Sequence, residues 1–325
     1  MADITPVTLV IGLPRAGKTT MLTRLMRQAA MAETVVVAAQ PDPPMWWGGG
    51  CPCCAPRDDV ARALRALLPR VRRDEVRRVL IETTGLADPG PILATLLSDT
   101  VAASAYRLDG IVTVVDAVNG AAALDGREMA VRQVAVADRI VLSKGDLADP
   151  EGLRARLRRL NPDAPIIAVH NGVGDSLKVL AGGLFGSAGK VPDLQAWLDA
   201  DSFAAVDHAA HPFPSVDHEG QVEAFCLMFD HPLPQAEVIA WLERLILLHG
   251  DALLRMKGIL HLADHDRPVV IQSVGHLLFP PMPLEAWPES DRHNSRLTFI
   301  TRGLPRSAVE AGPPAFADTQ AAGRR

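Results

Sequence analysis

One stretch near the N-terminus decides the fold, and it reads Val7-Thr8-Leu9-Val10-Ile11-Gly12-Leu13-Pro14-Arg15-Ala16-Gly17-Lys18-Thr19-Thr20. Its first part predicts a buried strand, its middle matches G-x-x-x-x-G-K-[ST], and an amphipathic helical pattern follows. Such a loop curls its N–H groups around phosphates, with Lys18 at the β and γ phosphates and the Thr19 hydroxyl on Mg²⁺. The predicted nucleotide-binding residues of this phosphate loop are Gly12, Leu13, Pro14, Arg15, Ala16, Gly17, Lys18, Thr19 and Thr20.

Further short apolar runs alternate with amphipathic stretches through the first half of the chain. They are apolar enough to be buried on both faces, which is typical of strands in a parallel sheet with helices between them. We therefore predict an α/β fold, a P-loop NTPase domain with a mostly parallel central sheet. The expected strands after the first are Val35 to Ala38, Val79 to Ile81, Ile111 to Val115, Ile140 to Leu142 and Ile166 to Val169.

The second half has a different organisation. Residues 1–190 are assigned to the P-loop domain, and 191–220 to a linker rich in Gly, Ala, Pro, Asp and His. Residues 221–305 are expected to form a smaller α+β domain, and 306–325 a disordered tail. The elements expected in the second domain are strands at Val222 to Phe229, Gly258 to Leu262, Val269 to Ser273 and Leu297 to Ile300, with a helix at Gln235 to Leu248.

Composition excludes several classes of protein. The chain has 325 residues, is 48% hydrophobic, and carries 33 Lys and Arg against 38 Asp and Glu, a formal net charge of −5. Without a basic run, neither nucleic acid nor an anionic membrane surface is expected as a partner. Because no apolar run reaches the ~18 residues of a membrane-spanning helix, we expect a cytoplasmic protein.

A second candidate element follows the third predicted strand, in Glu82-Thr83-Thr84-Gly85. The carboxyl ends of parallel strands share one edge of the sheet, so an acid at this strand tip faces the same crevice as the phosphate loop. Glu82 is expected to hold Mg²⁺ through water, and the Gly85 N–H to face the γ-phosphate. We predict Lys18 and Glu82 as catalytic residues, and Thr19 and Glu82 as Mg²⁺ ligands.

A third element is Ser143-Lys144-Gly145-Asp146, which resembles the [NT]-K-x-D guanine-recognition motif of GTPases. The Asp146 carboxylate would accept two hydrogen bonds that guanine offers and adenine does not, while the Lys144 stem stacks on the purine. Ser143 stands where the motif usually has Asn, which shortens the side chain that tethers the loop and weakens the expected guanine preference.

Three of the four cysteines fall within Cys51-Pro52-Cys53-Cys54, directly after three glycines. Thiolates so close in sequence can converge on one borderline cation, and Zn²⁺ is favoured by thiolate ligation. We predict Cys51, Cys53 and Cys54 as metal ligands. A disulfide here would close a strained ring, and buried bystander thiols are a further interpretation that stays open. Cys226, inside a predicted strand, is interpreted as such a bystander.

Taken in order along the chain, these elements resemble the CobW-type GTPases, relatives of the nickel-enzyme maturation GTPases UreG and HypB. The resemblance rests on G-x-x-x-x-G-K-T, on C-x-C-C followed by Arg57-Asp58-Asp59, and on Glu82-Thr83-Thr84-Gly85-Leu86-Ala87-Asp88-Pro89. It continues through Val115-Asp116-Ala117-Val118-Asn119-Gly120, Ser143-Lys144-x-Asp146, and a C-terminal domain with Lys257-Gly258-Ile259-Leu260, Gln272-x-Val274-x-His276 and Arg296-Leu297-x-Phe299-Ile300. The segment Ala39 to Gly50 departs from the family pattern, being shorter and lacking the usual Asn-Glu-Phe-Gly-like stretch.

The resemblance implies a cytoplasmic GTPase with slow turnover that acts as a metallochaperone or metal insertase. GTP or GDP, Mg²⁺, and Zn²⁺ or Co²⁺ at the cysteines would be its cofactors, and a client metalloenzyme its partner; a homodimer is left open. The alternative is a nucleotide-dependent regulatory or assembly module with little hydrolysis and a structural cysteine site. A small-molecule kinase that uses ATP is a third hypothesis, and it predicts a preference for adenine.

Overall fold

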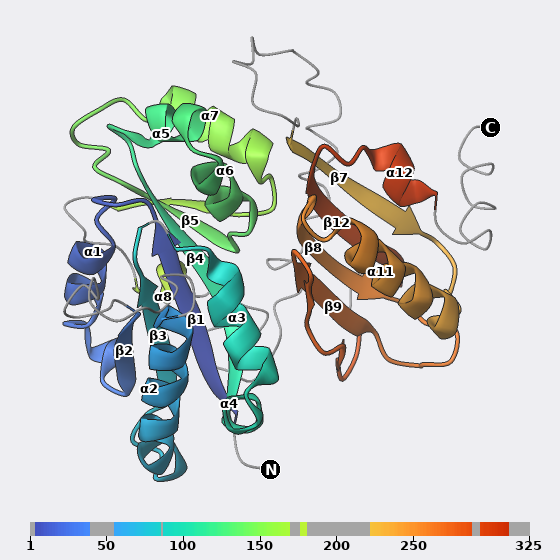
Figure 1. Ribbon diagram of the computed structural model, residues 1–325, viewed down its shortest axis with the longest axis horizontal. Coiled ribbons are helices and arrows are strands. Elements are labelled where there is room, and N and C mark those ends of the chain that lie inside the picture. The colour runs from blue at the N-terminus through green and yellow to red at the C-terminus, as the bar shows by residue number, and fades with distance from the viewer. Residues whose placement is uncertain are drawn as a thin grey trace. The chain divides into compact units, whose positions relative to one another are not determined.

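The computed structural model describes residues 4–39, 55–85, 87–169, 176–180, 222–287 and 293–311. Its contacts divide the chain into two compact units, one of residues 1–158 and 164–193, the other of residues 159–163 and 194–325 (Figure 1). The cysteines Cys51, Cys53 and Cys54 and the expected linker at 191–220 lie outside the described residues.

The first unit is built on a six-stranded sheet with the order β2-β3-β1-β4-β5-β6 (Figure 1). Every pair of neighbouring strands is parallel, which confirms the predicted central sheet. All six strands that the apolar runs predicted are present. Their bounds are β1 (Thr5–Gly12), β2 (Thr34–Ala39), β3 (Arg78–Thr83), β4 (Tyr106–Asp116), β5 (Arg139–Ser143) and β6 (Ile166–Ala168).

Helices cover both faces of this sheet. Residues of β1 alternate between the faces, so Val10 points toward α1 while Leu9 and Ile11 point away from it. On the opposite face, α2 and α3 run side by side in front of the sheet (Figure 1). The described helices are α1 (Lys18–Leu25), η1 (Ala29–Met31), α2 (Ala55–Arg72), α3 (Pro89–Ser98), α4 (Thr100–Ala105), α5 (Gly120–Gly126), α6 (Glu128–Ala135), α7 (Glu151–Leu160) and α8 (Ser176–Leu180).

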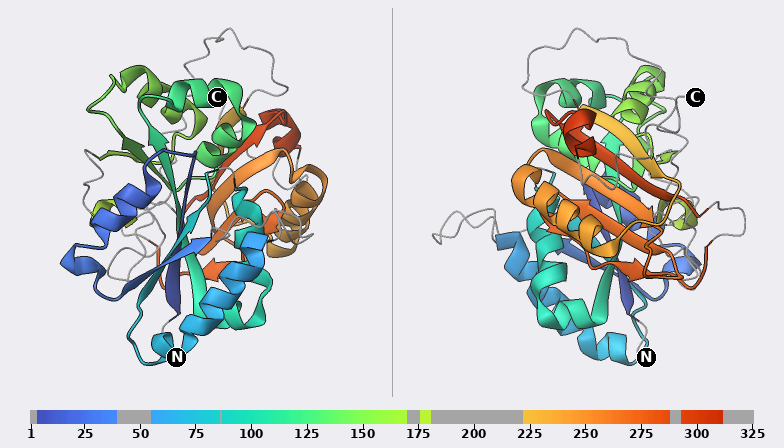
Figure 2. Two further views of the ribbon diagram at one scale, coloured as in Figure 1. Left: turned by 60° about the vertical axis from the view of Figure 1, so that its left-hand side comes forward. Right: turned by 90° about the vertical axis from the view of Figure 1, so that its right-hand side faces the viewer.

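The second unit is built on an antiparallel sheet with the order β10-β9-β8-β12-β7, with β11 paired to β9. Helix α11 (Gln235–His249) runs across one face of it, as the right-hand view of Figure 2 shows. The sheet and helix confirm the expected α+β domain. The strands are β7 (Val222–Phe229), β8 (Leu253–Leu260), β9 (Val269–Val274), β10 (Leu277–Leu278), β11 (Met282–Pro283) and β12 (Ser295–Arg302).

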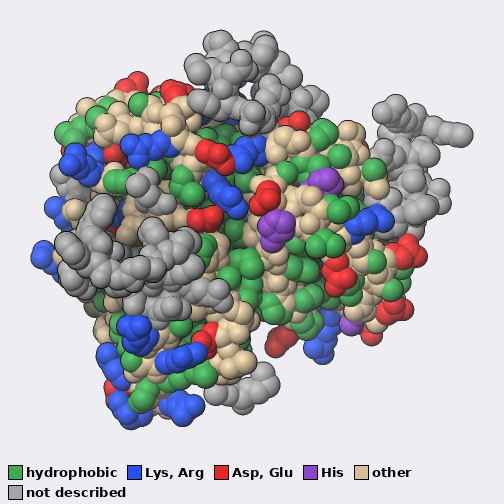
Figure 3. Space-filling model, in the orientation of Figure 1, with side chains coloured by type: hydrophobic (Ala, Val, Ile, Leu, Met, Phe, Trp, Pro, Cys, Tyr) green, Lys and Arg blue, Asp and Glu red, His purple; other side chains and the backbone are tan. Residues whose placement is uncertain are grey.

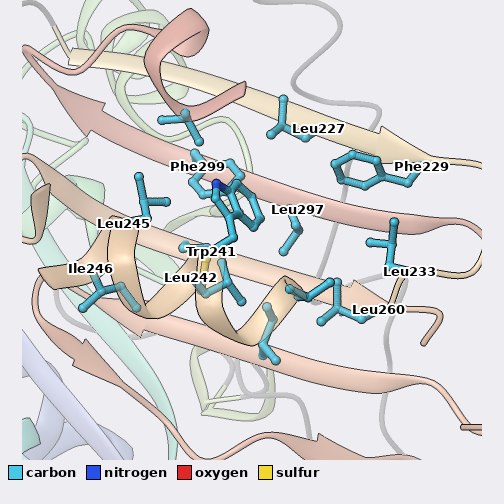
Figure 4. Packing of buried hydrophobic residues seen from close by; sticks show 14 of the residues in the cluster. Leu227, Phe229, Leu233, Trp241, Leu242, Leu245, Ile246, Leu260, Leu297 and Phe299 are labelled. Carbon is cyan, nitrogen blue, oxygen red and sulfur yellow. The ribbon is translucent and has the colours of Figure 1, made fainter. Parts of the chain in front are cut away.

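Aromatic packing forms the centre of this second core (Figure 4). Phe299 on β12 is fully buried, stacks on Phe225 with ring centroids 5.4 Å apart, and meets the edge of Trp241 at 6.2 Å. Such pairs stabilise a core beyond the area they bury. Trp241 comes from α11, so this contact fixes the helix on the sheet.

Two domain assignments need correction. Residues 306–310, expected in a disordered tail, form helix α12 (Arg306–Glu310), because Val309 is fully buried in the second core and the Arg306 Nε donates to Glu310 Oε1 at 2.6 Å. Residues 159–163, expected in the first domain, group with the second unit. There the Lys257 Nζ, 2% exposed, donates to the buried Asp163 carboxylate at 2.7 Å.

Basic side chains gather at the lower end of the first unit, where Figure 1 places α2 (Figure 3). They are matched by acids: Arg65 pairs with Asp99, and Arg73 and Arg70 both pair with Glu75. Exposed pairs of this kind add little stability, but they do offset the local positive charge. Among the described helices, none combines the length and apolarity that crossing a membrane requires.

The aromatic core predicts a large effect of truncating its central ring. Phe299→Ala should lower the free energy of unfolding by about 3–5 kcal/mol, because it removes a buried side chain and leaves a cavity. Met228→Ala on β7 is the control, since Met228 is 58% exposed, and it should change stability by less than about 0.5 kcal/mol. Urea unfolding followed by circular dichroism measures both, and equal effects of the two substitutions would contradict the assignment of this core.

Candidate nucleotide-binding site

The phosphate loop leaves β1 at Gly12 and enters α1 at Lys18. Its path needs positive φ at Gly12 (139°), Arg15 (62°) and Gly17 (92°). A Cβ on Gly12 would lie 2.3 Å from the backbone oxygen of Val114, so only glycine fits between β1 and β4 there. The sequence motif and the geometry of the loop therefore agree.

Lys18 is 7% exposed and points back over the loop. Its Nζ donates to the carbonyl oxygen of Gly12 at 2.6 Å and to that of Leu13 at 3.1 Å. Burial lowers the pKa of Lys18, while the charge of nearby Glu82 raises it. The ammonium is thus held at the mouth of the loop, where phosphate oxygens would replace the two carbonyls as its partners.

The two predicted Mg²⁺ ligands lie next to each other. Thr19 is the second residue of α1, and its Oγ1 donates to Glu82 Oε1 at 2.5 Å. Glu82 is 4% exposed near the end of β3, in register with Val10 of β1. A hydroxyl and a carboxylate are the hard oxygen donors that Mg²⁺ prefers when phosphates and water complete its shell, so these side chains fit the ion.

The turn after β3 runs directly against the phosphate loop. A Cβ on Gly85 would lie 2.1 Å from the backbone nitrogen of Pro14 and 2.6 Å from the carbonyl carbon of Leu13. Real Cβ atoms do not approach backbone this closely, so position 85 accepts only glycine unless the loop moves. The backbone of Gly85 is thereby kept beside the loop, and the contact of its N–H with the γ-phosphate stays a prediction.

The guanine-recognition segment also reaches the phosphate loop. Ser143 donates from Oγ to the Ala16 carbonyl at 2.7 Å, so its shorter side chain still tethers the loop. Lys144 Nζ donates to the Arg15 carbonyl at 2.8 Å, and Asp146 lies exposed two residues further on. The structure thus brings Ser143 and Lys144 against the loop and leaves the Asp146 carboxylate accessible to a base.

Sequence reasoning assigned no role to Asp116 and Asn119, although both belong to a quoted stretch of the family pattern. Asp116 ends β4, is 5% exposed, and accepts a hydrogen bond from Lys144 Nζ at 3.1 Å. Its other oxygen accepts from the Asn119 N–H at 2.6 Å. An acid at the tip of a buried strand, the signal already used for Glu82, would have identified Asp116.

A cavity of about 570 Å³ lies against one side of the phosphate loop. Its walls include Leu13 to Ala16 of the phosphate loop, the end of β4 and the helices α5 and α6. Lys18, Thr19, Glu82 and Ser143 do not line it. Metal ligation by the cysteines stays a prediction, and the described residues hold no group of three or more His, Cys, Asp or Glu side chains able to bind a metal.

A parallel sheet with this loop, an acid beside it and a Lys-x-Asp segment at the same edge defines a P-loop nucleoside-triphosphate-binding protein. Comparison with known families agrees. Residues 45–168 match the profile described as CobW/HypB/UreG, nucleotide-binding domain, and residues 222–313 match that of the cobalamin synthesis protein cobW C-terminal domain.

Individual proteins are similar to this chain, two matches over nearly its full length and one over about half of it. The zinc chaperone YjiA of Escherichia coli K12 is 30% identical over 322 residues, covering 94% of this chain and 96% of YjiA. The crystal structure of Zn(II)-bound YjiA GTPase superposes with a TM-score of 0.70 at 27% identity, covering 97% and 99% of the two chains. A zinc-regulated GTPase metalloprotein activator 1 of Schizosaccharomyces pombe is 31% identical over 189 residues, covering 51% and 46%. The chain belongs to the CobW family of nucleotide-binding proteins.

The contact at Gly85 predicts that even one methyl group there damages the site. Gly85→Ala should lower affinity for nucleotide at least tenfold, about 1.4 kcal/mol, because the new Cβ displaces Pro14 and with it the phosphate loop. Gly126→Ala is the matched control, since a Cβ at Gly126 meets nothing within 4 Å. Titration with a fluorescent GTP analogue measures both variants, and unchanged binding by Gly85→Ala would refute the close approach.

Proposed function

We propose that the protein is a GTP-hydrolysing metallochaperone that binds Zn²⁺ or Co²⁺ at Cys51, Cys53 and Cys54 and delivers it to a client metalloenzyme. One observation carries the proposal. The segment that holds the cysteines leaves β2 at Ala39, which pairs in register with Thr83, the residue after Glu82. The carboxyl end of β2 thus lies at the sheet edge where the nucleotide would bind, so one segment can respond to nucleotide and hold the metal.

Relatives support the metal part of the proposal. YjiA is named a zinc chaperone, its solved structure is described as Zn(II)-bound, and the match extends over nearly the full length of both chains. Zinc suits a cluster of thiolates, which also bind Co²⁺. The proposal places the protein in the cytoplasm, where GTP is available and thiols stay reduced.

The nucleotide half of the cycle follows from the side chains around the phosphate loop. On binding, Lys18 Nζ exchanges the carbonyls of Gly12 and Leu13 for phosphate oxygens. Thr19 and Glu82 are the side chains that would hold Mg²⁺, Glu82 through water. Mg²⁺, when bound, neutralises charge on the β and γ phosphates. The backbone of Gly85 abuts the loop, which supports a role for it in sensing the γ-phosphate and its loss.

Metal binding and release form the second half of the cycle, and loss of the γ-phosphate drives the switch between them. With GTP bound, contacts to the γ-phosphate would order the segment between Ala39 and α2 and bring the three cysteines together. Hydrolysis would release the segment and let the metal pass to a client. The nucleotide can shift the equilibrium between the ordered and the released segment only by as much as its own affinity differs between these two states. The switch can therefore be measured as a change of metal affinity on nucleotide binding.

Guanine preference is expected to depend on Asp146. Asp146→Ala should lower GTP affinity at least tenfold and leave ATP affinity unchanged, because only guanine donates two hydrogen bonds to this carboxylate. Asp149 is also exposed and lies three residues further on, where it accepts a hydrogen bond from the Glu151 N–H of α7; Asp149→Ala is the control and should alter neither affinity. Competition of GTP and ATP against a fluorescent GDP analogue provides the measurement. A wild-type protein that prefers ATP would support a kinase and sink the proposal.

Metal affinity is expected to depend on the nucleotide. Zn²⁺ or Co²⁺ affinity, measured by chelator competition, should differ at least fivefold between the Mg-GTP and nucleotide-free states, within the usual range of allosteric coupling. Replacing Cys51, Cys53 and Cys54 by Ser should abolish the tight site and the thiolate-to-cobalt absorption bands. Cys226→Ser is the control: burial raises the pKa of Cys226 to about 12, so its thiol does not ionise to a ligand. Equal metal affinities in the two states mean zero coupling and rule out the switch.

A further inference from the structure

The turn from β4 into α5 contains a buried carboxylate that the nucleotide cycle above does not use. Asp116 is 5% exposed and ends β4, where it lies in register with Ser143 at the end of β5. Its Oδ1 accepts from the Asn119 N–H at 2.6 Å, and the Asn119 Nδ2 donates to both carboxylate oxygens at 3.2 Å. Hydrogen bonds within the turn therefore already fix the position of the carboxylate.

The partner from another strand is Lys144. Its ammonium lies between Asp116 Oδ2, at 3.1 Å, and the carbonyl oxygen of Arg15, at 2.8 Å. The backbone of Lys144 has φ 57°, in the left-handed region that side chains other than glycine rarely adopt. A residue in this conformation needs contacts that hold it there, and the two hydrogen bonds of its ammonium supply them.

The electrostatics favour an ionised Asp116. Burial raises the pKa of this carboxyl, but the hydrogen bonds from Asn119 and the charge of Lys144 outweigh burial and hold the pKa below its ordinary value. A partly buried pair with additional hydrogen bonds is screened less by water than a surface pair, so it restrains the lysine effectively.

Ser143 makes a second anchor necessary. A hydroxyl has one hydrogen to donate, and Ser143 uses it on the Ala16 carbonyl at 2.7 Å, with the Val115 carbonyl at 3.4 Å as a distant second acceptor. The neighbouring loop residue, Arg15, is held instead by Lys144. Since Asp116 holds Lys144 in turn, the tether of the phosphate loop runs through this carboxylate.

We propose that Asp116 is a positioning residue for guanine recognition, which acts by holding Lys144 in place. With its ammonium anchored at Asp116 and Arg15, the stem of Lys144 presents a fixed apolar surface on which the purine stacks, beside the accessible Asp146. The same ammonium contacts the Arg15 carbonyl of the phosphate loop, and Asp116 acts on base recognition through Lys144 without contacting the base. This role rests on the proposed function, because it takes GTP as the nucleotide.

A double-mutant cycle tests the role. Asp116→Asn keeps an oxygen for the Asn119 N–H but removes the charge that faces Lys144. It should weaken GTP binding about tenfold and lower the preference for GTP over ATP by a similar factor, as expected for loss of one charge-assisted hydrogen bond. In a Lys144→Met background, Asp116→Asn should change neither the GTP affinity nor the preference for GTP over ATP any further, because the ammonium through which Asp116 acts is absent.

Asp109→Asn is the matched control, because Asp109 lies on the same strand with the same 5% exposure and pairs with Arg78 at 2.9 Å, away from the phosphate loop. Asp109→Asn should leave the ratio of GTP affinity to ATP affinity unchanged. Asp116→Glu, which keeps the charge, should recover part of the preference. Should Asp116→Asn not fold, the same cycle is run with Asp116→Glu, whose carboxylate is displaced by one methylene, and the same lack of additivity is expected.

The outcomes separate the two proposals. A wild-type preference for GTP together with additive effects of Asp116→Asn and Lys144→Met overturns the positioning role and leaves the GTPase proposal standing. The positioning role also falls if Asp116→Asn weakens GTP and ATP binding equally, because that is what mere damage to the fold would do. A wild-type preference for ATP overturns both proposals.

Discussion

Close backbone contact on both sides of the phosphate loop is the constraint on which the site depends. On one side Gly12 passes β4 so closely that a Cβ would meet the Val114 oxygen at 2.3 Å. On the other side Gly85 passes so close to Pro14 that a Cβ would lie 2.1 Å from the Pro14 nitrogen. The loop is therefore confined between β3 and β4, the strands that flank β1, without help from a ligand.

This confinement explains why polar residues from three strands can act on one loop. Strands β3, β4 and β5 end at the same edge of the parallel sheet, and each ends in or near a buried polar side chain: Glu82, Asp116 and Ser143. Buried polar groups need partners, and here the partners are supplied by the loop, by α1 or by Lys144. The site is thus a network in which each side chain limits the positions of the others.

The parts of the fold that a local pattern encodes were predictable. The phosphate loop has a motif with a fixed backbone consequence, and the six parallel strands are short apolar runs between amphipathic segments. Helix α12 was missed because its five residues sit in an Ala- and Pro-rich tail, and only the burial of Val309 in the second core orders them. Residues 159–163 group with the second unit, where Asp163 pairs with Lys257, 94 positions further along the chain, and no local pattern shows such a pairing.

The site was predictable to a similar extent. Glu82, Gly85 and Lys144 could be assigned because each stands at a known distance from the end of a strand, and the structure brings all three to the loop. That Ser143 would still reach Ala16 could not be foreseen, since the outcome depends on how close β5 lies to the loop. The role of Asp116 could not be predicted because its partner, Lys144, follows the next strand, and a linear pattern does not show which strand ends face each other.

The side chains that would bind nucleotide are not idle before it arrives. Lys18 is bonded to Gly12 and Leu13, and Thr19 to Glu82, so each has a partner within the protein. Binding therefore exchanges protein hydrogen bonds for bonds to phosphate and magnesium, and only the difference appears as affinity. Departure of the nucleotide would restore the internal partners, which would lower the cost of returning to the nucleotide-free arrangement. A site that is satisfied in both states can alternate between them, and a protein that captures and releases a cargo needs that property.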